Sequence, residues 1–343
     1  NLAQLGWFDG RRPRDQGISW DAKVVGGGGV LEINDLDLKL GESDVNGFVR
    51  FTKGDVPRLE IDVDSESIVF GPLLEEEEFK YDAEPEFDDG RLIPDIVIPF
   101  DTMKKLNASI DIDIRALTRD ALRIRNVDLV IELQDGVLDI RNASFDARSG
   151  GIKARGKLAP ADGAGKASLE LVARNLNLGL VQTDLDAAMI GDIDMKLDSA
   201  GADARALAGN LNGVILVDTR GGQVASSRAL HAIYGDMLTE ILNTINPFHK
   251  SDPVTSFKCI VMPLKFTDGK LTSHPNSFIS TNKVRMTLKS TIDLNTEKID
   301  MNIRTTPQRG LSISGGELFN PYLRIVGTLA APRLAVDEAG VLI

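Results

Sequence analysis

The residues of this chain that could do chemistry are mainly carboxylates, and the densest group of them begins shortly after residue 71. It comprises Glu75 to Glu78, Asp82, Glu84, Glu86, Asp88 and Asp89. Carboxylate oxygens are good ligands for a divalent cation, but the spacing is not that of an EF-hand loop. A block of like charges repels itself and is typical of a solvated linker. The pattern therefore favours an acidic linker over residues 71–95, with a cation site as the alternative.

A second set of carboxylates has the short spacing of paired acid and base groups. It comprises Asp111, Asp113, Asp192, Asp194 and Asp293. Each of them alternates with Ile, Leu or Met, and this period of two places them on the solvated face of strands. We therefore expect these aspartates to be surface residues without a catalytic role.

The remaining candidates for chemistry are isolated. No HExxH, GxSxG or Cys–His cluster surrounds the three histidines, His231, His249 and His274. Cys259 is the single cysteine and lies among apolar residues, so we expect it to be a small buried hydrophobe. The glycines at 26–29 lack the following helix that a phosphate loop needs, so a turn is the better interpretation. We expect no enzyme, no metal site and no cofactor.

Composition excludes further classes of function. The net charge of −12 argues against nucleic acid, because phosphates attract basic surfaces. No stretch of about twenty apolar residues is present, so no membrane span is expected within this sequence. The first residue is Asn1 rather than Met, and we expect a processed or partial product of a longer chain.

One helix is predicted, over residues 226–246. Ser226 or Ser227 can cap its first turn, and Pro247 lacks the amide hydrogen needed to continue it. Its apolar residues recur at steps of three and four, which puts them on one face. They are Leu230, Ile233, Tyr234, Met237, Leu238, Ile241, Leu242 and Ile245.

The rest of the chain predicts strands. Residues 106–114 read LNASIDIDI, which alternates strictly between apolar and polar side chains. Asp135-Gly136 and Asp268-Gly269 favour tight hairpin turns. A similar succession of strand, turn and strand recurs around residues 18–70, 106–180 and 257–305. Two all-β architectures fit, a sandwich of two sheets and one long sheet, and the alternation does not say what covers the apolar face.

Several longer segments resemble the AsmA-like family, which includes AsmA, TamB and YhdP. In residues 205–336 the resemblance lies in LAGNLNGVILVDTRGGQV, STNKVRMTLKSTIDLNTEKIDMNIRTTP and NPYLRIVGTLAAPRLAVDEAG. Residues 92–181 resemble the preceding repeat of the family, and RLEIDVDSESIVFGPLL resembles the repeat before that. The resemblance covers nearly the whole chain.

The resemblance implies an all-β fold, an elongated, twisted, U-shaped antiparallel β-groove with one helix near the C-terminal part. Residues 1–70 would be a partial groove repeat and 71–95 the acidic linker. Residues 96–204 would form a further groove repeat, and 205–343 the AsmA-like C-terminal region that contains the helix.

The function implied is lipid transport in the periplasm of a Gram-negative bacterium, with phospholipid acyl chains moving along the apolar groove between the inner and outer membranes. The implied partners are phospholipids, the inner membrane through an anchor absent from this sequence, and an outer-membrane or envelope protein. Bound phospholipid or fatty acyl chains are the only ligands implied. The alternative is a non-enzymatic scaffold for outer-membrane assembly whose apolar face is packed by its own residues.

The alternation and the resemblance together predict which side chains line the groove. The predicted lining comprises Ile110, Ile112, Leu129, Ile131, Leu133, Leu169, Leu171, Ile193, Met195, Leu197, Met286, Leu288, Ile292, Leu294, Met301, Leu323 and Ile325. The apolar stripe of the helix would cover the groove as a lid or, alternatively, close the core of the last repeat.

Overall fold

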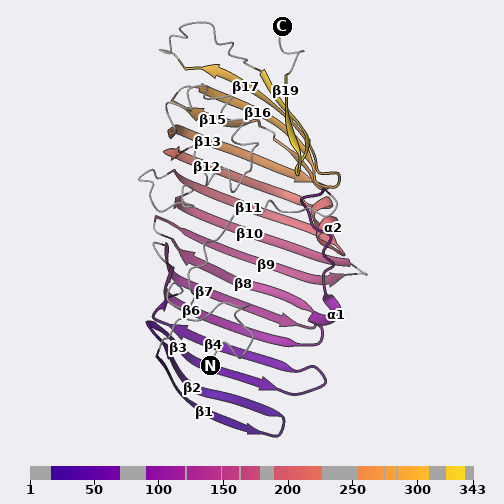
Figure 1. The fold of residues 1–343 in the computed structure, drawn as a ribbon. Coiled ribbons are helices and arrows are strands. Elements are labelled where there is room, and N and C mark those ends of the chain that lie inside the picture. The colour runs from indigo at the N-terminus through magenta and orange to yellow at the C-terminus, as the bar shows by residue number, and fades with distance from the viewer. Residues whose placement is uncertain are drawn as a thin grey trace. The chain divides into compact units, whose positions relative to one another are not determined.

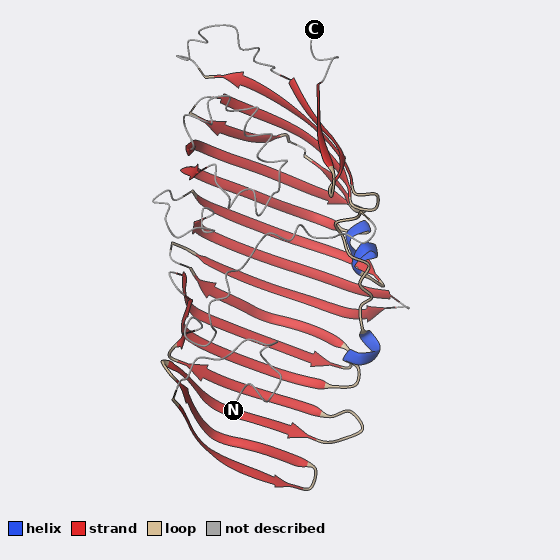
Figure 2. Cartoon of the chain, viewed as in Figure 1, coloured by secondary structure: helices blue, strands red, loops and turns tan. Residues whose placement is uncertain are grey.

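The computed structural model describes the chain in ten segments, which together are mainly β. They are residues 17–69, 90–119, 122–147, 149–161, 164–177, 189–225, 254–273, 275–282, 284–308 and 322–336. The described residues form nineteen strands and two short helices (Figures 1 and 2). They belong to two compact units, unit 1 with residues 1–80 and 99–163, and unit 2 with residues 81–98 and 164–343. The expected all-β class is confirmed.

In the part of unit 1 that the structure describes there are nine strands and one helical turn. They are β1 (Ile18–Gly27), β2 (Val30–Leu40), β3 (Ser43–Thr52), β4 (Arg58–Ser65), β5 (Ile68–Val69), α1 (Phe100–Met103), β6 (Asn107–Arg119), β7 (Leu122–Gln134), β8 (Val137–Asp146) and β9 (Gly151–Ala161). The last two residues of the glycine run, Gly28 and Gly29, form the expected turn between β1 and β2 at positive φ, whereas Gly26 and Gly27 belong to β1.

Strand pairing in unit 1 departs once from the expected antiparallel pattern. β1 to β4 pair in sequence order and β6 to β9 do the same, all antiparallel. β4 and β5, however, both pair with β6 in parallel. Parallel neighbours need a crossover of a dozen or more residues, and the connection between Val69 and Asn107 is long enough to supply it.

The described residues of unit 2 form ten strands and one short helix. They are β10 (Ala164–Asn177), β11 (Ile190–Gly201), α2 (Ala204–Gly209), β12 (Asn212–Ala225), β13 (Val254–Thr267), β14 (Lys270–Thr272), β15 (Ser277–Thr281), β16 (Val284–Asp293), β17 (Lys298–Pro307), β18 (Tyr322–Thr328) and β19 (Pro332–Val336). All pairings between them are antiparallel. β14 and β15 each pair with both β13 and β16, so they act as one interrupted strand.

The predicted helix at 226–246 and the proposed lid residues lie outside the described residues. α2 is capped by Asp203, whose carboxylate accepts a hydrogen bond from the Ala206 amide at 2.7 Å. Among the described residues, neither helix has the length and apolar character required to cross a bilayer.

Among the described strands, three contain a residue other than glycine at positive φ, and at each the alternation of side chains shifts by one residue. Asp35 in β2, Asn126 in β7 and Asn175 in β10 have φ of 50°, 50° and 51°. Asn and Asp tolerate this conformation better than other side chains. In β2 the bulge places Ile33 opposite Val49 and the third residue on, Leu36, opposite Gly47. The apolar side chains therefore stay on one face although their spacing in the sequence changes by one.

A strap formed by residues 90–98 binds the turns of unit 2. The Leu92 and Ile93 amides donate to Glu297 at 2.6 and 3.1 Å, and Arg91 Nε donates to the same carboxylate at 3.3 Å. Glu297 lies in the turn between β16 and β17 and is 1% exposed. Arg205 of α2 donates to the Ile93 carbonyl at 3.0 Å, and towards the other end of the strap the Ile98 amide donates to the Ala202 carbonyl at 3.1 Å. The strap thus joins two turns that are far apart in the sequence.

Candidate functional site

The candidate site in unit 1 is one apolar face that crosses β2, β3, β4, β6, β7 and β8. Strand register places six β-branched residues opposite one another in a single row. They are Ile33, Val49, Ile61, Ile110, Ile131 and Ile140. The rows on either side are also apolar and contain the other predicted lining residues of this unit, Ile112, Leu129 and Leu133.

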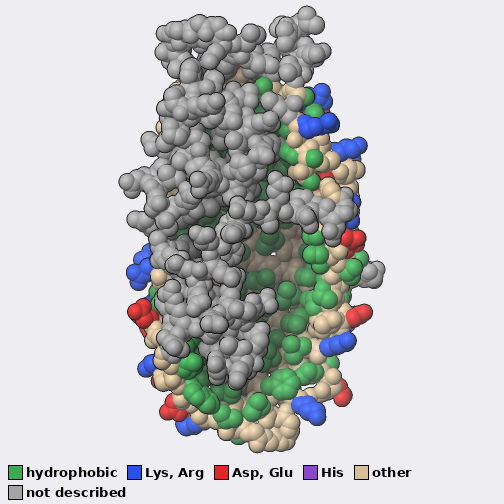
Figure 3. All heavy atoms as spheres, viewed as in Figure 1, with side chains coloured by type: hydrophobic (Ala, Val, Ile, Leu, Met, Phe, Trp, Pro, Cys, Tyr) green, Lys and Arg blue, Asp and Glu red, His purple; other side chains and the backbone are tan. Residues whose placement is uncertain are grey.

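This face is only partly withdrawn from solvent. Ile110, Ile112, Leu129, Ile131 and Leu133 are all half-buried. In the lower part of Figure 3, hydrophobic side chains gather on the face of unit 1 turned towards the viewer, and charged side chains lie along its margins. At the edge, Trp20 of β1 is 66% exposed. Unit 1 therefore presents an extended apolar surface that its described residues do not fully cover.

Unit 2 has an equivalent face on β10 to β13. Leu171, Met195, Ile215 and Leu264 form one row across these four strands. Neighbouring rows bring in the predicted residues Ile193, Leu197 and Leu169. All are half-buried except Leu169, which is 39% exposed.

The model of the AsmA family matches residues 72–276, which is more than half of the 343 residues. The chain belongs to the AsmA family. No curated protein and no solved structure matches it. The resemblance noted in the strand segments is thereby confirmed at the level of the family.

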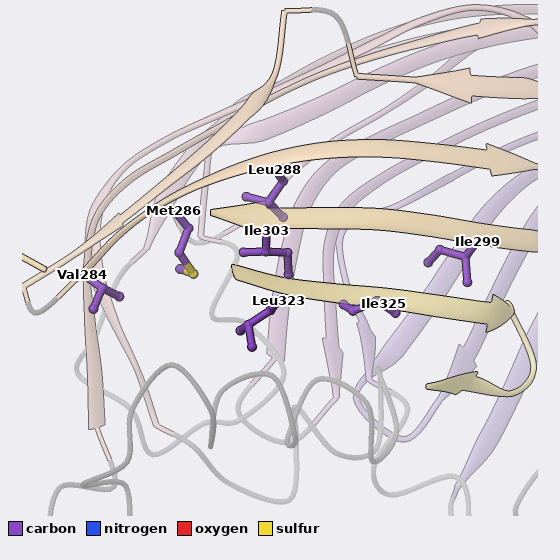
Figure 4. Packing of buried hydrophobic residues seen from close by; sticks show 7 residues of the cluster. All are labelled: Val284, Met286, Leu288, Ile299, Ile303, Leu323 and Ile325. Atoms are coloured by element: carbon purple, nitrogen blue, oxygen red, sulfur yellow. The ribbon is translucent and has the colours of Figure 1, made fainter. Parts of the chain in front are cut away.

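The last strands of this AsmA-family chain hold the rest of the predicted lining in a different environment. Seven residues of β16, β17 and β18 form a buried cluster (Figure 4). They are Val284, Met286, Leu288, Ile299, Ile303, Leu323 and Ile325. Ile292 and Met301 pack against this cluster. Leu294 departs from the expected strand, because β16 ends at Asp293 and Leu294 is half-buried in the following turn.

The outward face of unit 1 in this AsmA-family chain carries a block of aspartates. Asp62 lies opposite Asp111, and Asp113 lies between Asp64 and Asp128. Loss of hydration and the negative charges of Asp128, Asp111, Asp62 and Asp64 raise the pKa of Asp113. Among the described residues, no group of His, Cys, Asp or Glu has the geometry of a metal site. These aspartates form a solvated face, as the alternation predicts.

Because the pKa of Asp113 is raised, removing its charge should increase the free energy of unfolding, and the increase should depend on pH. Below the pKa that Asp113 has in the unfolded chain, its carboxyl is protonated in both the folded and the unfolded state. It then carries no charge that could lower the free energy of unfolding. The cost of the charge accumulates as pH rises from the unfolded-state pKa to the raised folded-state pKa of Asp113, and it is complete above the latter. Asp113→Asn should therefore raise the free energy of unfolding at pH 7 by about 0.5 kcal/mol, since directly opposed like charges destabilise sheets. The gain should vanish below about pH 4.

The control for Asp113→Asn is Asp139→Asn in β8. Asp139 lies between Glu132 and Lys157, so its charge has one repulsive and one attractive neighbour. Denaturant unfolding at pH 7 should show little change for this variant. If both substitutions raised the free energy of unfolding equally, or if the increase for Asp113→Asn persisted in acid, repulsion between the aspartates would not be its cause.

Cys259 differs modestly from its expected environment. It is half-buried rather than buried, because it lies opposite Arg220 and points away from the face that carries its neighbour Ile260. His231 and His249, like residues 71–89 of the predicted linker, lie outside the described residues, as does His274. The described end of the linker, residues 90–95, belongs to the strap and is bound to unit 2.

Part of the apolar face was missing from the predicted lining. Ile61 of β4, Ile140 of β8, and Ile215 and Val217 of β12 lie in the same rows as the predicted residues. The alternation in RLEIDVDS and VLDIRN is the signal that identifies Ile61 and Ile140, whereas the continuous apolar run VILV does not distinguish Ile215 and Val217 from their exposed neighbours. The strap could not be found this way, because Glu297 and Leu92 are far apart in the sequence.

Proposed function

We propose that this AsmA-family chain is a periplasmic lipid carrier, and that phospholipid acyl chains lie against the apolar faces of its two units. The supporting observation is the partly exposed state of these faces, which are built from whole rows of Ile, Leu, Val and Met. Covering such a surface with an acyl chain is favourable by about 0.8 kcal/mol per methylene removed from water. Family membership supports a role in the cell envelope.

In this proposal the chain acts without chemistry, metal or cofactor, and bound phospholipid is its only ligand. It works between the inner and outer membranes of a Gram-negative bacterium. The full-length protein is anchored in the inner membrane, and a protein of the outer membrane or envelope receives or supplies the lipid.

Lipid extraction tests this function directly. The chain, purified without detergent from a Gram-negative host, should release phospholipid on organic extraction, identified by mass spectrometry at about one molecule or more per chain. A soluble protein without an apolar face, purified in parallel, gives the background. Phospholipid at background level would contradict the proposal.

The second candidate function is a structural scaffold in envelope assembly. The buried cluster in β16 to β18 favours it, because there the apolar residues are packed within the protein. If the chain is a scaffold, the phospholipid extracted from it should stay at background level. Deletion of its gene should nevertheless impair the outer membrane.

A further inference from the structure

The face of unit 2 that carries the row of Met195, Ile215 and Leu264 is called its inward face. The large apolar side chains on this face are partly exposed up to β13 and mostly buried from β14 onwards. Up to β13, the row of Met195, Ile215 and Leu264 is half-buried, although the smaller Ala173 and Thr219 on the same face are buried. From β14 onwards, Leu271 is 4% exposed, Ile303 is 2% exposed and neighbouring residues of the cluster are similarly buried. The change occurs within one antiparallel arrangement of strands, and therefore reflects packing rather than a change of fold.

The same boundary separates two compositions. The rows of β10 to β13 are made mainly of Leu, Ile, Val, Met, Ala and Phe, with Gly191, Gly213 and two hydroxyl residues, Ser199 and Thr219, towards the strand ends. Beyond β13, hydroxyl side chains also lie within the central rows, with Ser277 opposite Leu288, Ser290 opposite Met301 and Thr305 opposite Met286. These three hydroxyl residues are all buried, and Ser277 Oγ has no hydrogen-bond partner. A row that mixes hydroxyls with apolar groups is a poor surface for an acyl chain.

We propose that acyl chains occupy the inward face of unit 2 as far as β13 and do not pass β14, so that β14 to β18 close the lipid site of this unit. The inference rests on the proposed lipid-carrier function and specifies where the site ends. It places Met195 and Ile193 inside the site and Met286, Leu288, Leu323 and Ile325 outside it, as members of a closing core.

The physical reason is that an acyl chain can enter the buried cluster only if packed side chains move apart. Protein cores are packed as densely as organic crystals, so an acyl chain entering the cluster must displace side chains that already contact one another. On β10 to β13 the chain instead replaces water against side chains that are already partly exposed, which is favourable.

The test uses the unaltered protein and phosphatidylethanolamine vesicles that contain a diazirine in one acyl chain. After irradiation and proteolysis, mass spectrometry locates the lipid adducts. Peptides from β10 to β13 should carry at least ten times more adduct than peptides from β16 to β18. Comparable labelling of β16 to β18 would overturn the boundary while supporting lipid carriage, as would labelling of unit 1 with none in unit 2. Labelling of neither unit would overturn lipid carriage as well.

A matched pair of methionines gives a second measurement. The photo-crosslinking residue p-benzoylphenylalanine is placed at Met195 in β11 or at Met301 in β17, and at the outward neighbours Asp198 and Asn302 as controls. Natural phosphatidylethanolamine should crosslink at Met195 and at none of the other three positions. Equal crosslinking at Met195 and Met301, in variants with parental circular dichroism, would overturn the boundary.

Discussion

Ile131→Asp should remove the phospholipid bound against unit 1 and leave the phospholipid bound against unit 2. Ile131 is the fifth residue of the six-residue row of unit 1, directly between Ile110 and Ile140. A carboxylate at this point would face the acyl chain without a compensating hydrogen bond or opposite charge, and such burial costs several kcal/mol. Organic extraction followed by mass spectrometry measures the loss.

The control for this variant places the same charge on the other face. Gln134→Asp, three residues further along β7, adds a carboxylate at an exposed position, and lipid content should not change. Because a charge at Ile131 can also unfold the sheet, Ile131→Asn serves as a milder variant, and circular dichroism reports the folded fraction. A folded Ile131→Asp variant with parental lipid content would show that this row does not bind acyl chains.

Glu297→Ala should lower the free energy of unfolding of unit 2 by about 3 kcal/mol, because a buried ionic partner is removed. The substitution leaves the Leu92 and Ile93 amides without their acceptor and removes the ion pair with Arg91. Denaturant unfolding measures the loss of stability. Hydrogen exchange should show faster exchange of the Leu92 and Ile93 amides, since the strap is released from the turn.

Asp300→Ala in the neighbouring strand is the matched control. Asp300 also pairs with an arginine, Arg324, but this ion pair is partly exposed on both sides, so its removal should cost less than about 1 kcal/mol. The Leu92 and Ile93 amides should exchange at the parental rate in this variant. Equal losses for the two substitutions would show that Glu297 has no special role in holding the strap.

Hairpins and strand faces were predictable from the sequence because both depend on neighbouring residues. Asp135-Gly136 and Asp268-Gly269 form the expected turns, with positive φ at all four residues. The alternation of Ile110, Ile112 and Asp111 likewise places the isoleucines on one face and the aspartate on the other, since successive side chains of a strand point in opposite directions. The boundaries of the repeats, the role of the predicted helix and the lining of a lipid site stay predictions.

The tertiary structure alone decided which strands are neighbours and which apolar residues are buried. The parallel pairing of β4 with β6 joins segments separated by the long connection from Val69 to Asn107, and no local pattern records it. Met195 and Met301 occupy the same kind of alternating strand, yet only Met301 packs against a buried cluster. Alternation shows which face a residue belongs to, whereas burial depends on what packs against that face, and this comes from contacts between residues distant in the sequence.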